Sequence, residues 1–150
     1  MAVSDFVNLC EAWSQQSRLA PPSLEAALDG ELSFHFIWQG VVVDVMYVPN
    51  ASEDHAFVLF GLGPVVQANA DPSALMRSLL EANFLSLHVH PPCFSLNPAT
   101  GDAVLQCLYP MAGTAGSGGL AGLVERGVDI ALRWRAGRFM DQPRITNEFA

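Results

Sequence analysis

The sequence predicts an α+β fold in which three helices pack on one antiparallel sheet, in the order α-β-β-β-α-β-β-α. Two patterns support this fold class. Three segments repeat their apolar residues at helical spacing, and five shorter segments alternate apolar and polar residues or are rich in β-branched residues. Short turn sequences between neighbouring strand segments favour hairpins, and therefore antiparallel pairing.

The first helix is predicted to begin at Ser4, whose side chain can cap a helix N-terminus. Apolar residues then recur at positions i, i+3, i+4 and i+7, which places them on one face: Phe6, Leu9, Cys10 and Trp13. Residues 20–30 contain two adjacent prolines and are predicted to be a connection, although SLEAALD can hold a short turn of helix.

Three strands are predicted between residues 31 and 66. The segment ELSFHFIW alternates, and its apolar face consists of Leu32, Phe34, Phe36 and Trp38. The pair Gln39-Gly40 forms a short turn into the β-branched segment VVVDVMYV, and an acidic loop precedes AFVLFGLGPVV, which is apolar on both faces. These segments are typical of an antiparallel meander.

A helix, a hairpin and a further helix are predicted to complete the chain. Asp71-Pro72-Ser73 is a strong start for the helix SALMRSLLEANFLSL, whose apolar arc is wide enough to contact more than one surface. The turn NPATGD joins the two strands of the hairpin. The glycine-rich segment MAGTAGSGGLAG is predicted to be flexible and leads to the helix GLVERGVDIALRWRAGRF.

Length and composition predict one domain, residues 1–140, followed by a flexible tail, residues 141–150. A chain of 150 residues can bury a core without disulfides or metals. Its net charge of −8 and its lack of lysine argue against nucleic-acid binding, which requires clustered cations. Hydrophobic residues make up 51% of this short chain, so we expect a subunit interface or a protein-binding surface to cover the surplus.

The cysteine pattern and the apolar runs indicate the cellular compartment of the protein. Three cysteines without a CxxC pair predict a reducing cytoplasm rather than a disulfide framework. The longest apolar run is about half a membrane span, and the N-terminal residues lack the signal-peptide pattern. A soluble cytoplasmic protein without a membrane partner is therefore expected.

The stretch HVHPPC raises the alternative of a metal site, because His88, His90 and Cys93 are residue types that zinc and copper bind. His88 and His90 would point to the same side of a strand. The prolines between His90 and Cys93 impose an extended kink, however, and no second Cys/His pair lies nearby at ligand spacing. A connection between the middle helix and the second hairpin is the favoured interpretation, with no metal and no cofactor.

Catalytic chemistry is not expected either. Cys93 begins a strand rather than a helix, so nothing in the sequence lowers its pKa toward that of a nucleophile. Asp44 is a lone acid in a strand, and Glu53-Asp54 is a solvated loop. The glycines of MAGTAGSGGLAG lack the spacing and the lysine of a phosphate-binding loop. The sequence therefore predicts no enzyme.

Two motifs resemble those of the CesT (Tir chaperone) family of type III secretion chaperones. LLEANFL on the middle helix matches the family's LL-x-x-N helix. FSLNPATGDAVLQCLYPM matches its F-x-L-(D/N)-x-x-(T/S)-G-x-x-x-L hairpin with a final apolar-proline pair, here Tyr109-Pro110. The element order, the acidic composition and Trp134 in the last helix agree, and the resemblance covers about residues 3–138.

The resemblance implies a homodimeric, cytoplasmic, non-enzymatic bacterial chaperone that uses no ATP. It would bind the N-terminal segment of a secreted virulence effector as an extended chain, through apolar patches and strand addition at a sheet edge. The secretion ATPase would be a further partner. The implied effector-binding residues are Phe6, Leu9, Trp13, Leu32, Phe34, Phe36 and Trp38. The implied dimer-interface residues are Leu79, Leu80, Asn83, Phe84, Leu105, Cys107 and Tyr109.

Two alternatives to the secretion chaperone stay open at this point. One is a small α+β protein-binding or regulatory module of the same fold without a role in secretion. The other is a metal-binding enzyme that uses His88, His90 and Cys93.

Overall fold

The computed structural model describes residues 2–66, 71–112 and 119–139. Its helices are α1 (Ala2–Ser17), α2 (Pro72–Leu85) and α3 (Gly119–Arg135). Its strands are β1 (Glu25–Ala26), β2 (Leu32–Trp38), β3 (Val41–Tyr47), β4 (His55–Pro64), β5 (Cys93–Leu96) and β6 (Asp102–Pro110), with a 3-10 turn, η1 (Leu28–Gly30). None of the described helices is long and apolar enough to cross a membrane.

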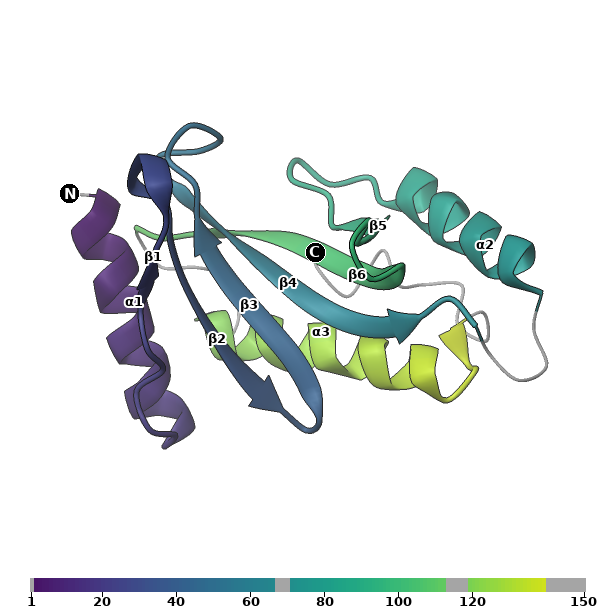
Figure 1. The fold of residues 1–150 in the computed structure, drawn as a ribbon, viewed down its shortest axis with the longest axis horizontal. Helices are drawn as coiled ribbons and strands as arrows, with labels where there is room; N and C mark the ends of the chain where they lie inside the picture. Colours follow the sequence, from purple (N-terminus) through teal and green to yellow (C-terminus); the bar gives the residue numbers. More distant parts are fainter. Residues whose placement is uncertain (1, 67–70, 113–118, 140–150) are drawn as a thin grey trace.

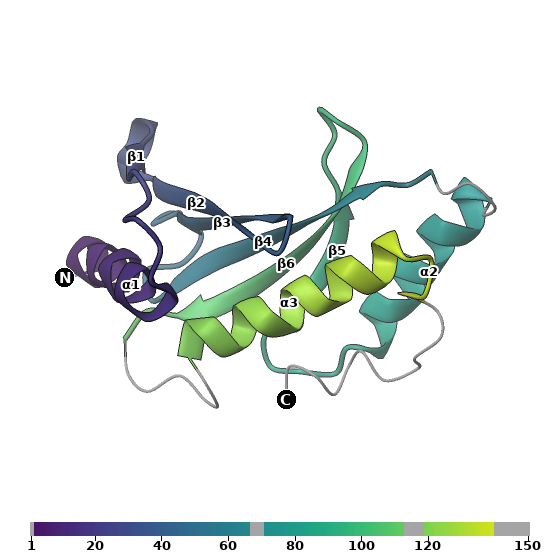
Figure 2. The same cartoon turned by 90° about the horizontal axis from the view of Figure 1, so that it is seen from below.

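The strands form one six-stranded sheet in the order β1-β2-β3-β4-β6-β5, and every neighbouring pair is antiparallel. Helix α3 runs along one face of this sheet, α1 lies at the β2 end, and α2 lies beside β5 at the opposite end (Figures 1 and 2). The predicted α+β class and the predicted order of the long elements are confirmed.

The turns explain why the sheet is a meander. Between β2 and β3, Gln39 and Gly40 both have positive φ angles (50° and 77°), which matches the tight turn that the strand twist favours. At the other hairpin, Gly101 has a φ of 75° and donates its N–H to the carbonyl of Asn97 (2.7 Å). Both turns lie where the sequence predicted them.

Two details differ from the prediction. The connection after α1 contains a two-residue strand, β1, and the turn η1, because Ala27 donates its N–H to the carbonyl of Glu31 (3.0 Å) and so pairs this segment with the start of β2. A strand this short leaves no periodicity to detect. Helix α1 begins at Ala2, and Ser4 lies inside its first turn rather than at its cap.

The start of α2 agrees with its predicted capping. The carboxylate of Asp71 accepts a hydrogen bond from the N–H of Ser73 (3.2 Å). Pro72 occupies the first turn, where backbone N–H groups have no partner within the helix, so the missing N–H of proline costs no hydrogen bond. Part of the glycine-rich segment, residues 113–118, and the predicted tail, residues 141–150, lie outside the described residues.

The core lies between the sheet and the two helices α1 and α3. Alternate residues of β2, β3, β4 and β6 point into it. α3 buries one continuous stripe against them, consisting of Leu120, Leu123, Val124, Gly127, Val128, Ile130, Ala131 and Trp134. The backbone of Gly127 lies directly on the ring of Phe60, so closely that a Cβ at this position would overlap the ring. Glycine is therefore required where α3 crosses β4.

Arg135 binds the C-terminal end of α3 to the sheet. The guanidinium of Arg135 donates to the carbonyls of Leu62 (3.1 Å), Gly40 (2.9 Å) and Gly61 (3.0 Å). These carbonyls belong to the β2–β3 turn and to the irregular part of β4, where the register shifts between Gly61 and Gly63. Arginine can satisfy all three because its donors form a rigid fork.

We expect Gly127→Ala to lower the free energy of unfolding by about 2 kcal/mol, because overpacking against the buried ring outweighs the better helix propensity of alanine. Urea unfolding followed by circular dichroism measures the change. The half-exposed Gly122 provides the control, and Gly122→Ala should be neutral or slightly stabilising. Combining Gly127→Ala with Phe60→Leu should recover part of the loss, and no recovery would contradict the proposed overlap.

Candidate protein-binding surfaces

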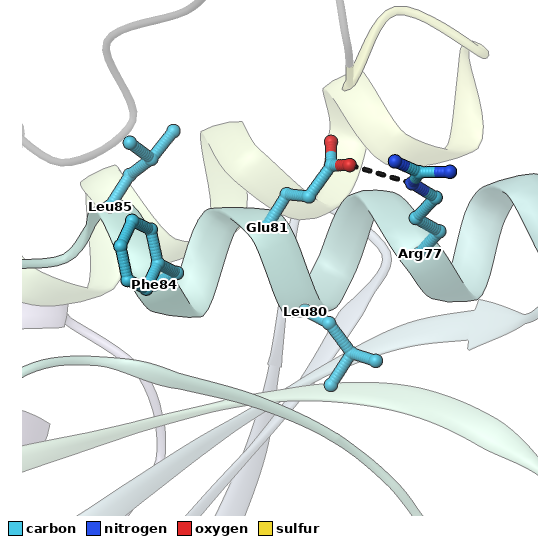
Figure 3. Close-up of a pocket in the computed structure, with 5 residues that line it drawn as sticks. All are labelled: Arg77, Leu80, Glu81, Phe84 and Leu85. Carbon is cyan, nitrogen blue, oxygen red and sulfur yellow. Dashed lines mark hydrogen bonds and ion pairs between the residues drawn. The ribbon is translucent and has the colours of Figure 1, made fainter.

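One face of α2 is apolar and uncovered. Leu80 is 68% exposed and Phe84 82% exposed, and with Leu85 they line a shallow hollow of about 460 Å³ together with Arg77 and Glu81. Figure 3 shows the ion pair between Arg77 Nε and Glu81 Oε1 (2.8 Å), Phe84 and Leu85 further along the helix, and Leu80 pointing to the side away from the ion pair. A helix face with exposed Leu and Phe and a charged margin is typical of a protein interface.

The apolar surface continues beyond the end of α2. Leu87 is 88% exposed and Val89 is 92% exposed, and both lie in the connection that leads to β5. We call the exposed side chains of Leu80, Phe84, Leu85, Leu87 and Val89 the α2 surface. So many large apolar side chains close together in a short segment indicate a surface that another molecule covers.

Asn83 holds α2 against β5. Its Oδ1 accepts a hydrogen bond from the N–H of Phe94 (2.7 Å), and its Nδ2 donates to the carbonyl of the same residue (2.9 Å). Both bonds go to the backbone of the edge strand β5. The side chain of Asn83 therefore satisfies the backbone N–H and carbonyl that a neighbouring strand would otherwise pair with. Asn83 thereby positions the α2 surface relative to the sheet.

The residues predicted for the dimer interface differ in their exposure. Leu80 and Phe84 belong to the α2 surface, and Asn83 is the link just described. Tyr109 is half-buried, and its pKa is raised by burial. The others are buried within the chain: Leu79, Leu105 and Cys107. An interface role for all of these residues stays a prediction.

The burial of Cys107 also affects its chemistry. Burial raises the pKa of its thiol to about 12, so the thiol is protonated at neutral pH.

Three members of the α2 surface, Leu85, Leu87 and Val89, were not among the predicted interface residues. The wide apolar arc of the middle helix was a signal for Leu87, which belongs to it, but not for Leu85 or Val89.

The residues predicted to bind a partner lie together, but mostly inside the chain. The ring of Trp13 stacks on Phe36 (4.4 Å between centroids) and meets Trp38 edge-on (5.7 Å), and Phe6 contacts Phe34 (5.4 Å). Phe6, Trp13, Phe34 and Phe36 are buried between α1 and β2, whereas Leu9, Leu32 and Trp38 are half-buried. Contact of these residues with a partner stays a prediction.

The outer edge of β2 is largely free. β1 pairs only with the start of β2, up to Ser33, and the bond from Ala27 to Glu31 shows that Glu31 and Ser33 turn their backbone groups toward β1. The direction alternates along a strand, so His35 and Ile37 point their N–H and C=O groups toward the same edge. Within the described part of the chain, no strand pairs with β2 there.

The sheet face opposite α3 is also uncovered near this edge. Ile37 is 64% exposed on β2, and Val42 is exposed on β3. His35 of β2 lies opposite Asp44 of β3 on the same face. Asp44 is half-buried, and burial raises the pKa of its carboxyl.

The stretch HVHPPC forms the connection between α2 and β5, as the sequence predicted. The ring of His90 contacts the ring of His55 (4.9 Å between centroids), and His55 Nδ1 is within hydrogen-bond distance of Ser52 Oγ (3.3 Å). The described ranges contain no group of three or more His, Cys, Asp or Glu side chains that could hold a metal ion. The exposed Cys93 has its thiol near the carbonyl of Phe94 (3.6 Å).

The fold and these surfaces define a small α+β protein-binding module. The family model for the Tir chaperone protein (CesT) family matches residues 15–135, so the chain belongs to this family of type III secretion chaperones. A solved structure described as the HopA1-SchA chaperone-effector complex contains a similar chain. It aligns with a TM-score of 0.58 at 14% identity, over 93% of this chain and 96% of that chain. Comparison with curated proteins gave no match.

We expect Asn83→Ala to lower the free energy of unfolding by about 2 kcal/mol, because it leaves the N–H and the carbonyl of Phe94 without their partner. Hydrogen exchange at the Phe94 amide, together with urea unfolding, measures the effect. Asn83→Asp keeps the acceptor and removes the donor, so amide protection should survive better than in the alanine variant. Equal protection of this amide in wild type and Asn83→Ala would contradict the link.

Proposed function

We propose that this secretion chaperone works as a homodimer that binds the N-terminal segment of a secreted effector as an extended chain. Binding keeps the segment unfolded, soluble and ready for export. Membership of the CesT family supports the chaperone role. The structural observation that supports extended binding is the free outer edge of β2, which offers two sets of backbone groups for hydrogen bonds.

The α2 surface supports the homodimer. A second copy would bring the same surface, so Leu80 and Phe84 of each copy would contact the partner copy, as in any two-fold interface. Large exposed apolar side chains at the centre of a patch contribute most of the binding energy of such interfaces. The connection with Leu87 and Val89 would extend the interface toward β5.

The effector segment would lie along β2. Its backbone would pair with His35 and Ile37, and alternate side chains would then point to opposite faces of the sheet. Those on the α1 side would meet the half-buried Leu9, Leu32 and Trp38. The buried cluster of Phe6, Trp13, Phe34 and Phe36 would keep this edge rigid, so that the strand is added to a preformed template.

This mode of action requires neither catalysis nor ATP, and we propose that the protein is not an enzyme. We propose the bacterial cytoplasm as its location, because effectors are bound there before export, and the secretion ATPase as the partner that receives the loaded complex. A regulatory module without an effector would share the same surfaces. The discriminating observation is whether an effector segment copurifies with the chain.

The dimer is tested by Leu80→Asp combined with Phe84→Asp. Wild type should elute as a particle of about twice 16.1 kDa in size-exclusion chromatography with light scattering. Buried carboxylates in the interface should raise the dimer dissociation constant roughly a hundredfold. Leu28→Asp changes a leucine on η1 that is 87% exposed and serves as the control. A monomeric wild type, or a variant that stays dimeric, would overturn this interface.

Client binding is tested by co-expression with candidate effector N-terminal segments. We expect a stable complex with wild type and a loss of at least about tenfold in affinity with Ile37→Pro, which removes one edge N–H and leaves the β2–β3 hydrogen bonds in place. Ile37→Val keeps the N–H and is the matched control. Thermal unfolding verifies that the proline variant folds. A folded proline variant that retains the client with wild-type affinity would exclude edge pairing.

A further inference from the structure

The charge along the free edge of β2 is uneven. Between Leu19 and Met76 the sequence contains seven acids and no lysine or arginine. The acids nearest to the start of β2 are Glu25 on β1 and Glu31 just before the strand. At the other end of β2, Arg135 lies at the turn beyond Trp38, where it donates to the carbonyl of Gly40. Glu125 also lies at this end, where its Oε1 accepts a hydrogen bond from Trp38 Nε1 (3.0 Å). The β1 end of the edge therefore carries acids only, whereas charges of both signs lie at the turn end.

Asp44 extends the negative end onto the open face of the sheet. It is half-buried on β3, directly across from His35, and Leu59 of β4 is its neighbour on the other side. Burial raises the pKa of its carboxyl, Glu25 raises it further, and His35 acts in the opposite direction. No described salt bridge neutralises Asp44. An ionised carboxylate in this position lacks a full counter-charge in the free protein.

We infer that the strand which adds to the outer edge of β2 carries an arginine or lysine on the open face of the sheet, opposite His35, where Asp44 and Glu25 recognise it. This inference rests on the proposed binding of an extended effector segment and states the chemistry of that segment. The occupant is thus an extended peptide with a cation near the β1 end. Its next side chains on the same face, toward Ile37, are apolar or neutral.

The reach of the side chains agrees with this placement. A strand added to β2 lies two inter-strand spacings from β3, which is about 10 Å. An arginine side chain that points along the sheet surface spans most of this distance, and its planar fork can bind a carboxylate in two places. Glu25 lies next to the end of the added strand, because β1 pairs with the same edge of β2. The acids at the β1 end set the register, because Glu125 and Arg135 carry opposite charges at the turn end.

Two short synthetic peptides of alternating valine and threonine, acetylated and amidated, provide the probe. One has a central arginine and the other a glutamine at the same position. Fluorescence anisotropy with the full-length chain measures both affinities. We expect the arginine peptide to bind about fivefold more tightly and to lose this advantage in Asp44→Asn. High salt should weaken only the arginine peptide.

Asp102→Asn is the matched control, because Asp102 is a half-buried acid at the start of β6, away from the β2 edge, and its removal changes the net charge equally. Equal loss of affinity in both variants would show unspecific attraction to an acidic protein and would overturn the inference. Equal affinity of the two peptides, or no binding of either, would overturn it as well. The proposed chaperone function is judged separately, by copurification of an effector segment.

Thermal stability gives a second measurement, because Asp44→Asn should weaken peptide binding but stabilise the free protein. Because the folded protein raises the pKa of Asp44, its ionised form destabilises the fold above that pKa, and this effect disappears as the pH falls and the carboxyl is protonated. Asp44→Asn should therefore raise the thermal midpoint at neutral pH, and the gain should shrink in acid. Lower stability of this variant at neutral pH would show that Asp44 serves the fold, and would overturn the inference.

Discussion

The position of α3 on the sheet depends on the contact between Gly127 and the ring of Phe60. Because no side chain stands between them, the helix approaches β4 closely enough to bury its whole apolar stripe against the strands. Arg135 then binds three carbonyls at the far end of the same helix, which secures its direction. α3 covers the middle of this face, and α1 packs on the same core at the β2 end.

The uncovered surfaces follow from this arrangement. α1 covers the aromatic residues of β2 but not the edge of the strand, and α2 lies beside β5, where it buries Leu75, Ser78 and Leu79 and exposes its other side. A chain in which 51% of the residues are hydrophobic therefore has one filled core and two surfaces that suit other protein chains. Because the three helices leave one side of α2 and the edge of β2 uncovered, the structure has a surface for each proposed partner, a second copy and an extended client.

Much of this fold could be predicted from the sequence, because its patterns are strong. The alternation in ELSFHFIW, the turn at Gln39-Gly40 and the capping by Asp71 each depend on local geometry, and the structure has them where they were expected. β1 was missed because two residues show no period, and its pairing depends on a bond to Glu31 that only the folded chain reveals.

The candidate site was less predictable. Period and hydrophobicity show that Phe34 and Phe36 share a face, but not whether α1 or a partner covers that face; in the structure, α1 does. Similarly, Leu79 and Leu80 are equivalent in the sequence, and only the docking of α2 against β5 buries the first and exposes the second. Core and interface draw on the same residue types, so their separation requires the assembled tertiary structure.

The bond between Asn83 and β5 has a consequence for how such a protein can diversify. The side-chain amide of Asn83 forms its two hydrogen bonds with the backbone N–H and carbonyl of Phe94, so these bonds do not depend on which side chain position 94 carries. Residues around it, including those of the connection after α2, are free to change without loosening the helix. An attachment of this kind lets the exposed surfaces vary from one chaperone to another while the scaffold beneath them stays constant.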